Sequence, residues 1–549
     1  MPEGNLMLTP HRTGAASDSP AGSADVAPGR SPARAAYVVI AVCTALAVFL
    51  RVFQLSRPGY LLGVTEYDDG ALFGNAVRLV NGVIPYRDFA DVEPPGSMVL
   101  IAPVALLAKV TGTAWALGVA RILTVGADCA CVALLGLLVR HRGPLAAGVA
   151  CGVYSVYPDA LVASHTFLLE PWLNLFCLIG ALLVFDRDQP ASNRRLAWGG
   201  AAFGFAVAVK LWAAVPLVIL GLLLARRPRR TAALAAGAAA GLGLTVLPFL
   251  AVAPGRLISD TITSQATKTD NRGMLPRLTF QGRWPRLNDL AGMSVFHGVP
   301  VDAGALVLLT VVVAIVAVYM VACVMTGRLP APLDWYAVIG AIAVILMFCW
   351  PELFYPHYGA FEGPFLALAL ALPVGLLRPA RSKPTLVPAL AVGIAVAALI
   401  AGAGLWQLGQ MVHLKPSVPP SVTATADRLI PPGSCVVTND ASFTISANRF
   451  VPDAAGCPSV VDSYGTYLAM TDGHIDHAEP RVLRSVATTW LEWFARADYV
   501  WLDPSDLKGE IPWTRSLYAY FAGHFRLVGL ASPYPGQGNV PRGGLYKRR

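Results

Sequence analysis

Charged side chains are scarce in this sequence. Asp, Glu, Lys and Arg make up 14% of its 549 residues, against about 25% in a typical soluble domain. Hydrophobic residues reach 55%, and the mean hydropathy is +0.56. This balance excludes a soluble globular enzyme, a disordered protein and a fibre. Because apolar stretches long enough to span a bilayer recur along the chain, the sequence predicts a polytopic α-helical membrane protein.

The motifs of several function classes are also missing. The sequence has no CxxC or zinc spacing, no Gly-rich phosphate loop, no HExxH and no nucleophile elbow. The net charge of +9 could suggest a nucleic acid partner. However, the basic residues form short clusters between apolar stretches, where the positive-inside rule makes them cytoplasmic anchors. We therefore expect no nucleic acid partner.

Cysteine is unevenly distributed. Seven of the nine cysteines lie in apolar stretches, where cysteine behaves as a small hydrophobe. The other two, Cys435 and Cys457, lie in the polar C-terminal region. A lone pair in a segment outside the cytoplasm suggests a disulfide.

Composition divides the chain into three parts. Residues 1–35 are rich in Ala, Gly, Ser and Pro and are predicted to be a disordered cytoplasmic tail. Residues 36–410 form the transmembrane domain, with a first external loop at 56–95 and a large one at 254–302. In residues 411–549, short β-like runs alternate with helix-like patterns, which predicts a small extracytoplasmic α/β domain.

The basic clusters orient the predicted helices. They place the N-terminus in the cytoplasm and the C-terminal domain outside, in a multi-pass protein of the cytoplasmic membrane. Stretch 97–111 conflicts with the cluster Arg140–Arg142, so either that stretch is re-entrant or the cluster breaks the rule. We expect eleven full spans and one partial span. Stretch 196–225 is predicted as two short helices, with Lys210 at an external turn, because lysine at mid-membrane is costly.

The first external loop is the most informative segment. Its acidic residues could simply cap short helices in a solvated loop. They occur, however, in three ordered pieces: Glu66-Tyr67-Asp68-Asp69-Gly70, Pro85-Tyr86-Arg87-Asp88-Phe89 and Asp91-Val92-Glu93-Pro94-Pro95-Gly96.

This ordered series resembles the membrane-embedded glycosyltransferases of the GT-C superfamily. In these proteins an acidic pair opens an amphipathic helix, a Gly-x-x-Pro-Tyr-Arg-Asp-like stretch follows, and Pro-Pro begins the next helix. The similarity covers roughly residues 36–410. Its later parts are Arg121, Leu169-Glu170-Pro171, and Gly200-x-x-x-Gly204 leading to Lys210. The Gly-x-x-x-Gly pairs at 200–204 and 237–241 are also helix-packing signals.

The resemblance implies a reaction and a set of site residues. A sugar would pass, with inversion, from a polyprenyl-phosphate donor to a cell-envelope glycan, lipid or protein acceptor at the outer membrane face. Asp68 would be the general base, with Asp69 as the alternative, and Glu170 would orient the acceptor or assist a metal. A divalent cation, Mg²⁺ or Mn²⁺, is optional in this superfamily. The leaving phosphate needs positive charge and hydrogen-bond donors, and the predicted topology makes five candidates external: Arg87, Lys210, Arg272, Arg283 and His357. The acceptor candidates are Tyr86, Asp88, His165, Tyr355 and Tyr358.

One departure and several alternatives stay open. Several relatives carry a phosphate-binding lysine just before Pro-Pro, where this chain has Glu93. High Ala, Gly and Arg usage fits a high-GC actinobacterium and favours arabinose or mannose from a decaprenyl-phosphate donor. A transporter or flippase of a lipid-linked substrate, or a catalytically silent glycan-binding relative, are the competing hypotheses. A polar run in the tail is either a solvated turn or a metal site: Asp472, His474, Asp476, His477 and Glu479.

Overall fold

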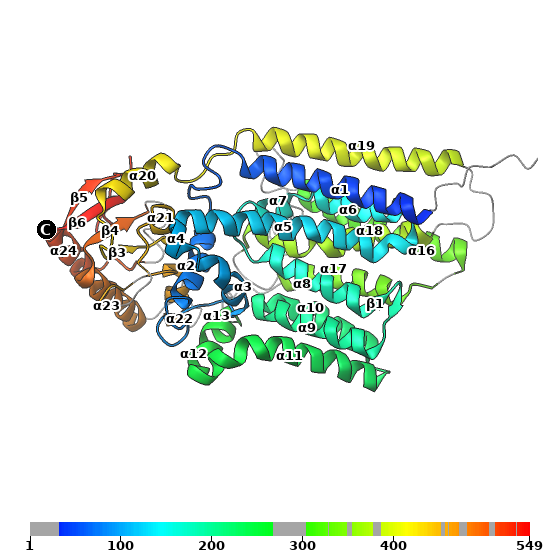
Figure 1. Cartoon of the computed structure of the whole chain (residues 1–549), viewed down its shortest axis with the longest axis horizontal. Helices are drawn as coiled ribbons and strands as arrows, with labels where there is room; N and C mark the ends of the chain where they lie inside the picture. The colour runs from blue at the N-terminus through cyan, green and yellow to red at the C-terminus, as the bar shows by residue number, and fades with distance from the viewer. Residues whose placement is uncertain are drawn as a thin grey trace, which may run out of the picture.

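The computed structural model shows a helical bundle with a small α/β domain at one end (Figure 1). We call the opposite end of the bundle the far end. The structure describes residues 32–266, 303–327, 329–348, 354–376, 386–451, 456–458, 460–471, 480–503, 511–533 and 535–549.

Long apolar helices make up the bundle. Within the described residues, five helices are long and apolar enough to cross a membrane, or six if the pair α6 and α7, bent by 56°, counts as one span. Five further apolar helices are shorter, with 10–17 residues. The expected eleven full spans therefore stay a prediction. The bundle helices are α1 (Pro32–Leu55), α5 (Thr113–Val139), α6 (Pro144–Ser155), α7 (Pro158–Ser164), α8 (Glu170–Val184), α9 (Asn193–Val209), α10 (Ala214–Leu224), α11 (Pro228–Val252), α16 (Ala303–Thr326), α17 (Pro332–Phe348), α18 (Gly363–Leu376) and α19 (Leu386–Met411).

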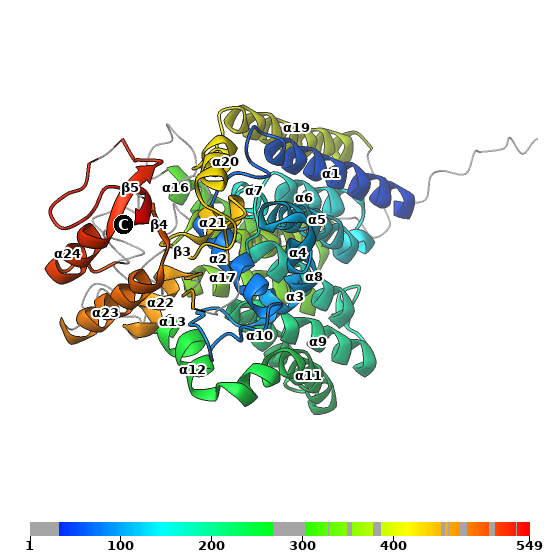
Figure 2. The ribbon, with the colours of Figure 1, turned by 60° about the vertical axis from the view of Figure 1, so that its left-hand side comes forward.

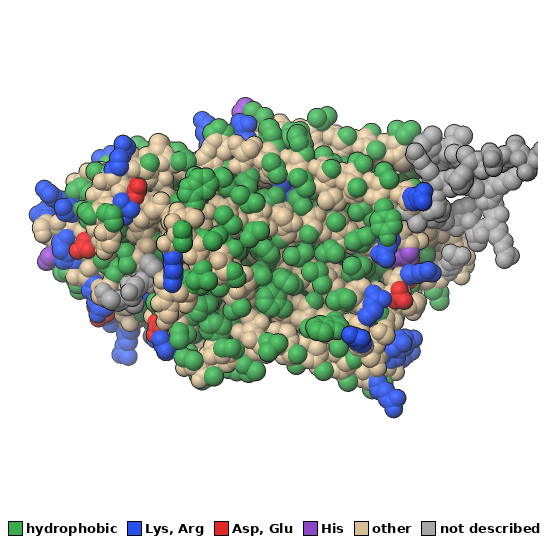
Figure 3. Space-filling view, viewed as in Figure 1, with side chains coloured by type: hydrophobic (Ala, Val, Ile, Leu, Met, Phe, Trp, Pro, Cys, Tyr) green, Lys and Arg blue, Asp and Glu red, His purple; other side chains and the backbone are tan. Residues whose placement is uncertain are grey.

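The outer surface of the bundle is apolar. Large side chains such as Val38, Leu244 and Leu399 are 62%, 83% and 74% exposed. Figure 3 shows hydrophobic side chains over the body of the bundle, with Lys and Arg gathered toward its two ends. Water would penalise such a surface and lipid would not. The chain is a multi-pass helical membrane protein.

Stretch 97–111 does not form a long span. It folds as α3 (Gly96–Ala105) and α4 (Ala108–Thr111), and ten residues of helix extend only about 15 Å. Gly96 allows α3 to approach α9 closely, because a Cβ there would lie 2.4 Å from the backbone of Ala208. This finding favours the re-entrant alternative over a broken positive-inside rule.

The apolar stretch around Lys210 is divided in two, as expected. Helix α9 ends at Val209, and Lys210 has an extended backbone (φ −155°, ψ 133°). The short 3₁₀ turn η2 (Leu211–Ala213) then leads into α10. The break removes a lysine from the middle of a helix and places it at the α/β end of the bundle, beside residues of α8 and of the 3₁₀ turn η6 (Pro356–Phe361).

Helices α9 and α11 are in unusually close contact through small residues, which confirms the packing signal. A Cβ on Gly204 would lie 2.1 Å from the carbonyl oxygen of Ala238. A Cβ on Gly237 would lie 1.9 Å from the carbonyl oxygen of Ala197. Van der Waals packing of this kind replaces the hydrophobic effect, which lipid does not supply between helices.

The C-terminal part is the expected small α/β domain. Its four-stranded sheet has the order β3-β4-β6-β5, in which β3 and β4 are parallel and the other pairs are antiparallel. Cys435 and Cys457 form a disulfide at the edge of this sheet. The elements are α20 (Pro420–Leu429), β3 (Val436–Thr438), α21 (Ala441–Ser446), α22 (Ser463–Met470), α23 (Pro480–Arg496), β4 (Tyr499–Leu502), α24 (Arg515–His524), β5 (Phe525–Gly529) and β6 (Gly544–Arg548).

Helix α2 (Tyr67–Leu79) joins the bundle to this domain. It lies beside α21 (Figure 2), and a Cβ on Gly70 would come within 2.3 Å of the Ser442 backbone nitrogen. The Ser442 hydroxyl donates to the carbonyl of Glu66 at 2.9 Å. On the bundle side, Thr113 donates to the carbonyl of Ile445 at 2.6 Å. These contacts fix the start of α2, where the acidic pair lies.

Candidate active site

A cavity of about 360 Å³ lies between α2, the bundle and the α/β domain. Residues that are far apart in the sequence meet there. They come from the loop before α3, the start of α8, the break at Lys210, the turn η6 (Pro356–Phe361) and the loop before α22. Its polar lining is Glu66, Tyr67, Asp68, Asn75, Asp91, Glu93, Glu170, Lys210, Gln265, Tyr355, His357, Tyr358, Asp462 and Tyr464.

Asp68 faces this cavity from the first turn of α2. Its side chain is 42% exposed, and Oδ2 lies 3.6 Å from Nε2 of His357. Desolvation of the carboxyl by the surrounding cavity wall raises the pKa of Asp68 above its usual value. The nearby imidazole of His357 acts in the opposite direction and lowers that pKa. A carboxylate whose pKa moves toward neutral pH is a better general base than a fully solvated one.

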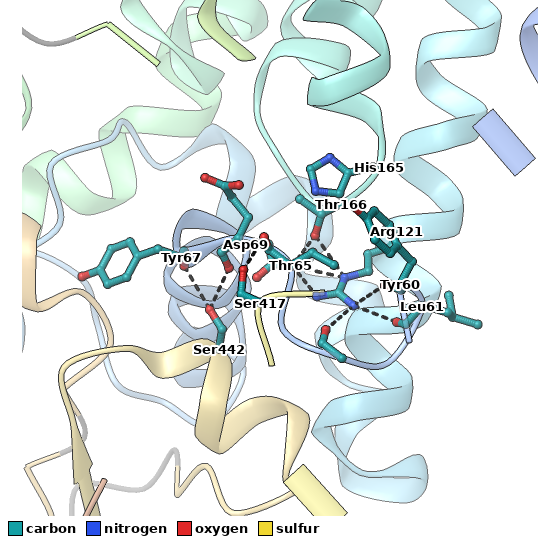
Figure 4. A network of polar contacts seen from close by, with 12 residues as sticks. Tyr60, Leu61, Thr65, Tyr67, Asp69, Arg121, His165, Thr166, Ser417 and Ser442 are labelled. Carbon is teal, nitrogen blue, oxygen red and sulfur yellow. Dashed lines mark hydrogen bonds and ion pairs between the residues drawn. The ribbon is translucent and has the colours of Figure 1, made fainter. Parts of the chain in front are cut away.

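Asp69 has a different environment, because consecutive helical residues point about 100° apart. It is fully buried and outside the cavity lining, and its Oδ2 accepts from Nη2 of Arg121 at 2.5 Å. The Thr166 hydroxyl donates to the same oxygen, and Figure 4 shows this network. Arg121 also donates to the carbonyls of Tyr60, Leu61 and Gly63. Asp69 therefore ties α2 to α5 and to Thr166, and Arg121 extends this network to the loop after α1.

Lys210 is a buried cation at the cavity wall. Its Nζ donates to Oε1 of Glu170 at 2.8 Å. The same Nζ lies 3.9 Å from the ring centre of Trp212 and 4.5 Å from that of Tyr358. Ion pairing and cation–π contact keep the ammonium charged in a buried setting. Glu170, the first residue of α8, contacts Lys210, which makes it a positioning group for that cation.

The turn η6 brings three expected residues to the cavity. The rings of Tyr355 and His357 are stacked with centres 5.7 Å apart, and the ring of Tyr358 meets His357 edge-on at 4.8 Å. His357 thereby lies next to Asp68 at the cavity wall, with Nε2 at 3.6 Å from Oδ2 of Asp68.

Carboxyl groups outnumber cations among the described residues that line this cavity. Burial, together with the neighbouring Asp68, Asp69 and Glu170, raises the pKa of Glu66 to about 8. Burial also raises the pKa of Asp91 well above its usual range. Glu66 therefore holds its proton at neutral pH, which lowers the negative charge that an incoming anion would meet.

Four expected site residues are not brought to the cavity. Arg87 and Asp88 pair with each other at 2.7 Å on the surface, outside the cavity lining. Tyr86 is fully buried at a positive φ of 65° and donates to a backbone carbonyl. His165 contacts a backbone carbonyl and the ring of Tyr60. Their polar atoms serve the local fold, so this geometry gives no support to the substrate contacts that we expected of them.

Other expected residues lie outside the described part of the chain. They are Arg272, Arg283 and the polar run Asp472, His474, Asp476, His477 and Glu479. Among the described residues, no three His, Cys, Asp or Glu side chains gather as ligands of one metal ion.

Sequence reasoning missed the contribution of the α/β domain. Asp462 and Tyr464 line the cavity, and the Tyr67 hydroxyl donates to Oδ1 of Asp462 at 2.8 Å. Asp462 ends the loop between α21 and α22, and Tyr464 lies in the first turn of α22. No local pattern marks them, because their role depends on a contact between residues 395 positions apart.

Comparison with known proteins agrees with this architecture. No protein-family model and no curated protein matches the sequence. ArnT from Cupriavidus metallidurans, solved bound to undecaprenyl phosphate, is 14% identical and covers 93% of this chain and 97% of its own, with a TM-score of 0.53. The chain has the GT-C fold. The GT-C oligosaccharyltransferase AglB from Archaeoglobus fulgidus, solved with an inhibitory peptide and a dolichol-phosphate, is 13% identical; 88% of this chain and 70% of AglB align, with a TM-score of 0.50. At such low sequence identities the structural similarity establishes the GT-C fold alone. The reaction has to be inferred from the residues that line the cavity.

Proposed function

We propose that the chain is a membrane glycosyltransferase that moves a sugar from a polyprenyl-phosphate donor to a cell-envelope acceptor. One observation carries this proposal: two side chains of opposite charge line the same cavity. They are Asp68, which is half exposed, and Lys210, which is buried and paired with Glu170. The GT-C fold supports it, and so do the lipid phosphates named with the two similar structures.

In the proposed reaction Asp68 is the base and Lys210 meets the donor phosphate. The acceptor oxygen attacks the anomeric carbon while its proton passes to a carboxylate oxygen of Asp68. The bond between the anomeric carbon and the phosphate oxygen breaks, and the lipid phosphate leaves with the electron pair. Attack opposite the leaving group inverts the anomeric centre. Lys210 stabilises the charge that develops on the leaving phosphate, and Glu170 holds its ammonium in place.

The acceptor is proposed to bind at the side of the cavity that the α/β domain lines. Tyr67, Asp462 and Tyr464 offer a carboxylate and two aromatic rings there. Such groups hydrogen-bond to hydroxyls and pack against sugar rings. The domain would then recognise the acceptor while the bundle holds the donor.

The donor sugar and orientation complete the proposal. We infer arabinose or mannose on decaprenyl phosphate, on the compositional ground of high Ala, Gly and Arg usage. The basic clusters at the far end of the bundle support a cytoplasmic N-terminus and an extracytoplasmic α/β domain, since positive clusters favour the cytoplasmic side. The cavity would then open at the outer face of the cytoplasmic membrane.

The experiment is a transfer assay in membranes that contain the wild-type chain or Asp68→Asn at equal expression. Each membrane receives radiolabelled decaprenyl-phosphate arabinose or mannose and a cell-envelope acceptor extract. We expect wild-type membranes to label the acceptor and the Asp68→Asn membranes to lose at least about 100-fold of that rate. Undiminished transfer by Asp68→Asn would refute the assigned base. Movement of donor across proteoliposomes without transfer would favour the transporter hypothesis.

A further inference from the structure

A second cavity, of about 600 Å³, lies at the far end of the bundle. Three regions line it: the start of α1; the end of α5 with the 3₁₀ turn η1 (Arg140–Arg142); and the end of α8 and the start of α9, with the hairpin of β1 (Phe185–Asp186) and β2 (Gln189–Pro190) that joins them. Figure 1 shows β1 and the start of α1 at the end of the bundle away from the α/β domain. The proposed reaction does not use this cavity.

Positive charge dominates its polar wall. Arg140, Arg187 and Arg195 line it, together with His141, and Asp186 is the one carboxylate among its described lining residues. Asp186 is 73% exposed and 3.8 Å from Arg195, so solvent screens that pair. The wall therefore carries an excess of positive charge toward the cavity.

Hydrogen bonds to backbone carbonyls hold two of the three arginine side chains, Arg140 and Arg195, in place. Arg195 donates through Nη2 to the carbonyls of Leu182 at 2.8 Å and Phe185 at 2.9 Å. Arg140 donates through Nη1 to a carbonyl near the end of α5. His141 is paired with Asp188 at 2.7 Å. A guanidinium has five donors, so Arg195 keeps donors for a ligand after making these two bonds.

The remaining wall is apolar. Tyr37, Leu137 and Leu182 line it, and Tyr37 continues into the exposed face of α1, where Val38 and Val42 are 62% and 63% exposed. A ligand that matches both the basic and the apolar part of the cavity wall has an anionic phosphate at one end and a hydrocarbon chain at the other. Arginine forks match phosphate oxygens, and tyrosine is common where headgroups meet acyl chains.

We propose that this far-end cavity binds the headgroup of an anionic phospholipid, whose acyl chains lie along the exposed face of α1. The phosphate contacts Arg140, Arg187 and Arg195. The lipid belongs to the membrane leaflet opposite the Asp68 cavity, because the two cavities lie at opposite ends of the bundle. It would hold α1 against the α8–α9 hairpin.

The test uses the purified full-length chain in a neutral detergent, titrated with phosphatidylglycerol. Phosphatidylcholine of the same chain length and inorganic phosphate are titrated in parallel, and native mass spectrometry counts bound lipid. Losing one arginine near an anionic headgroup weakens binding by about fivefold. We expect the double variant Arg140→Gln/Arg187→Gln to weaken phosphatidylglycerol binding by about 25-fold and to leave phosphatidylcholine binding unchanged. This variant spares the two carbonyl bonds of Arg195, and a lipid-free melting curve checks that it folds.

Arg194→Gln is the matched control, because Arg194 is exposed, adjacent to Arg195 and outside the cavity. It should bind phosphatidylglycerol as the wild type does. Equal weakening in Arg194→Gln would overturn the proposal in favour of diffuse surface charge. Equal binding of the two phospholipids would overturn it as well. Displacement of phosphatidylglycerol by millimolar inorganic phosphate would show that the site takes the free ion, and would overturn the lipid assignment.

Discussion

Two adjacent aspartates with the same side chain should give opposite phenotypes. Asp68 faces the cavity and is 42% exposed, while Asp69 is fully buried against Arg121. We expect Asp68→Asn to abolish transfer and leave the fold intact. We expect Asp69→Asn to unfold the protein more easily and to spare the chemistry in the molecules that remain folded.

The magnitudes follow from these environments. The Asp69→Asn substitution would leave the buried guanidinium of Arg121 without its charge partner, and breaking a buried pair from one side costs about 3–5 kcal/mol. Within the described part of the chain, the basic side chain nearest the Asp68 carboxylate is His357, with Nε2 at 3.6 Å. Replacing Asp68 should change stability by no more than about 0.5 kcal/mol, while loss of a general base lowers the rate about 100- to 10,000-fold.

The assay pairs two measurements on each purified variant: thermal unfolding in detergent and the initial rate of sugar transfer per folded molecule. The double comparison matters because low activity alone does not separate chemistry from folding. An Asp69→Asn protein as stable as the wild type but inactive would refute the division of roles. So would an Asp68→Asn protein that is destabilised by several kcal/mol.

Three further predictions test the site and the bundle. Lys210→Gln should raise the donor KM roughly 10- to 150-fold, because the substitution removes a charge-assisted hydrogen bond worth about 1.5–3 kcal/mol. An unchanged donor KM would show that Lys210 does not contact the donor phosphate. Glu66 holds its proton at pH values below its raised pKa of about 8. Above that pH its negative charge would oppose the anionic donor, so the donor KM should rise. A Glu66→Gln variant that keeps the same pH profile would contradict this. Gly204→Leu should destabilise the protein by at least about 1–3 kcal/mol, because even a Cβ meets the carbonyl of Ala238 at 2.1 Å. Gly221→Ala is its control, since no atom of the described residues lies within 4 Å of a Cβ there, and thermal unfolding that does not separate the two variants would contradict the packing argument.

Local sequence signals predicted the helical architecture well. Apolar stretches become helices wherever the backbone must satisfy its own hydrogen bonds, and the lysine in stretch 196–225 predicted the break that the structure has at Lys210. The Gly-x-x-x-Gly pairs predicted the close contact of α9 with α11. Each of these signals acts within a few turns of the chain, so a single sequence is sufficient to detect it.

The candidate site was predicted less completely. The ordered motifs led to Asp68, Glu170, Lys210 and the Tyr-His-Tyr turn of η6, which all line the cavity. They also led to Arg87 and its neighbours, which pair within their own loop. A motif indicates that a segment is close to the site; it does not show which face of that segment carries each side chain.

By itself, the sequence determined a multi-pass helical bundle, a break at Lys210 and a small α/β domain, because hydropathy and turn signals are local properties. Only the tertiary structure decided which carboxylate of the acidic pair meets solvent, since Asp69 finds Arg121 at a separation of 52 residues. It also decided that Asp462 completes the cavity, through a hydrogen bond to Tyr67 across 395 residues. The environment of a charge depends on what packs around it, and here those partners lie far away in the chain.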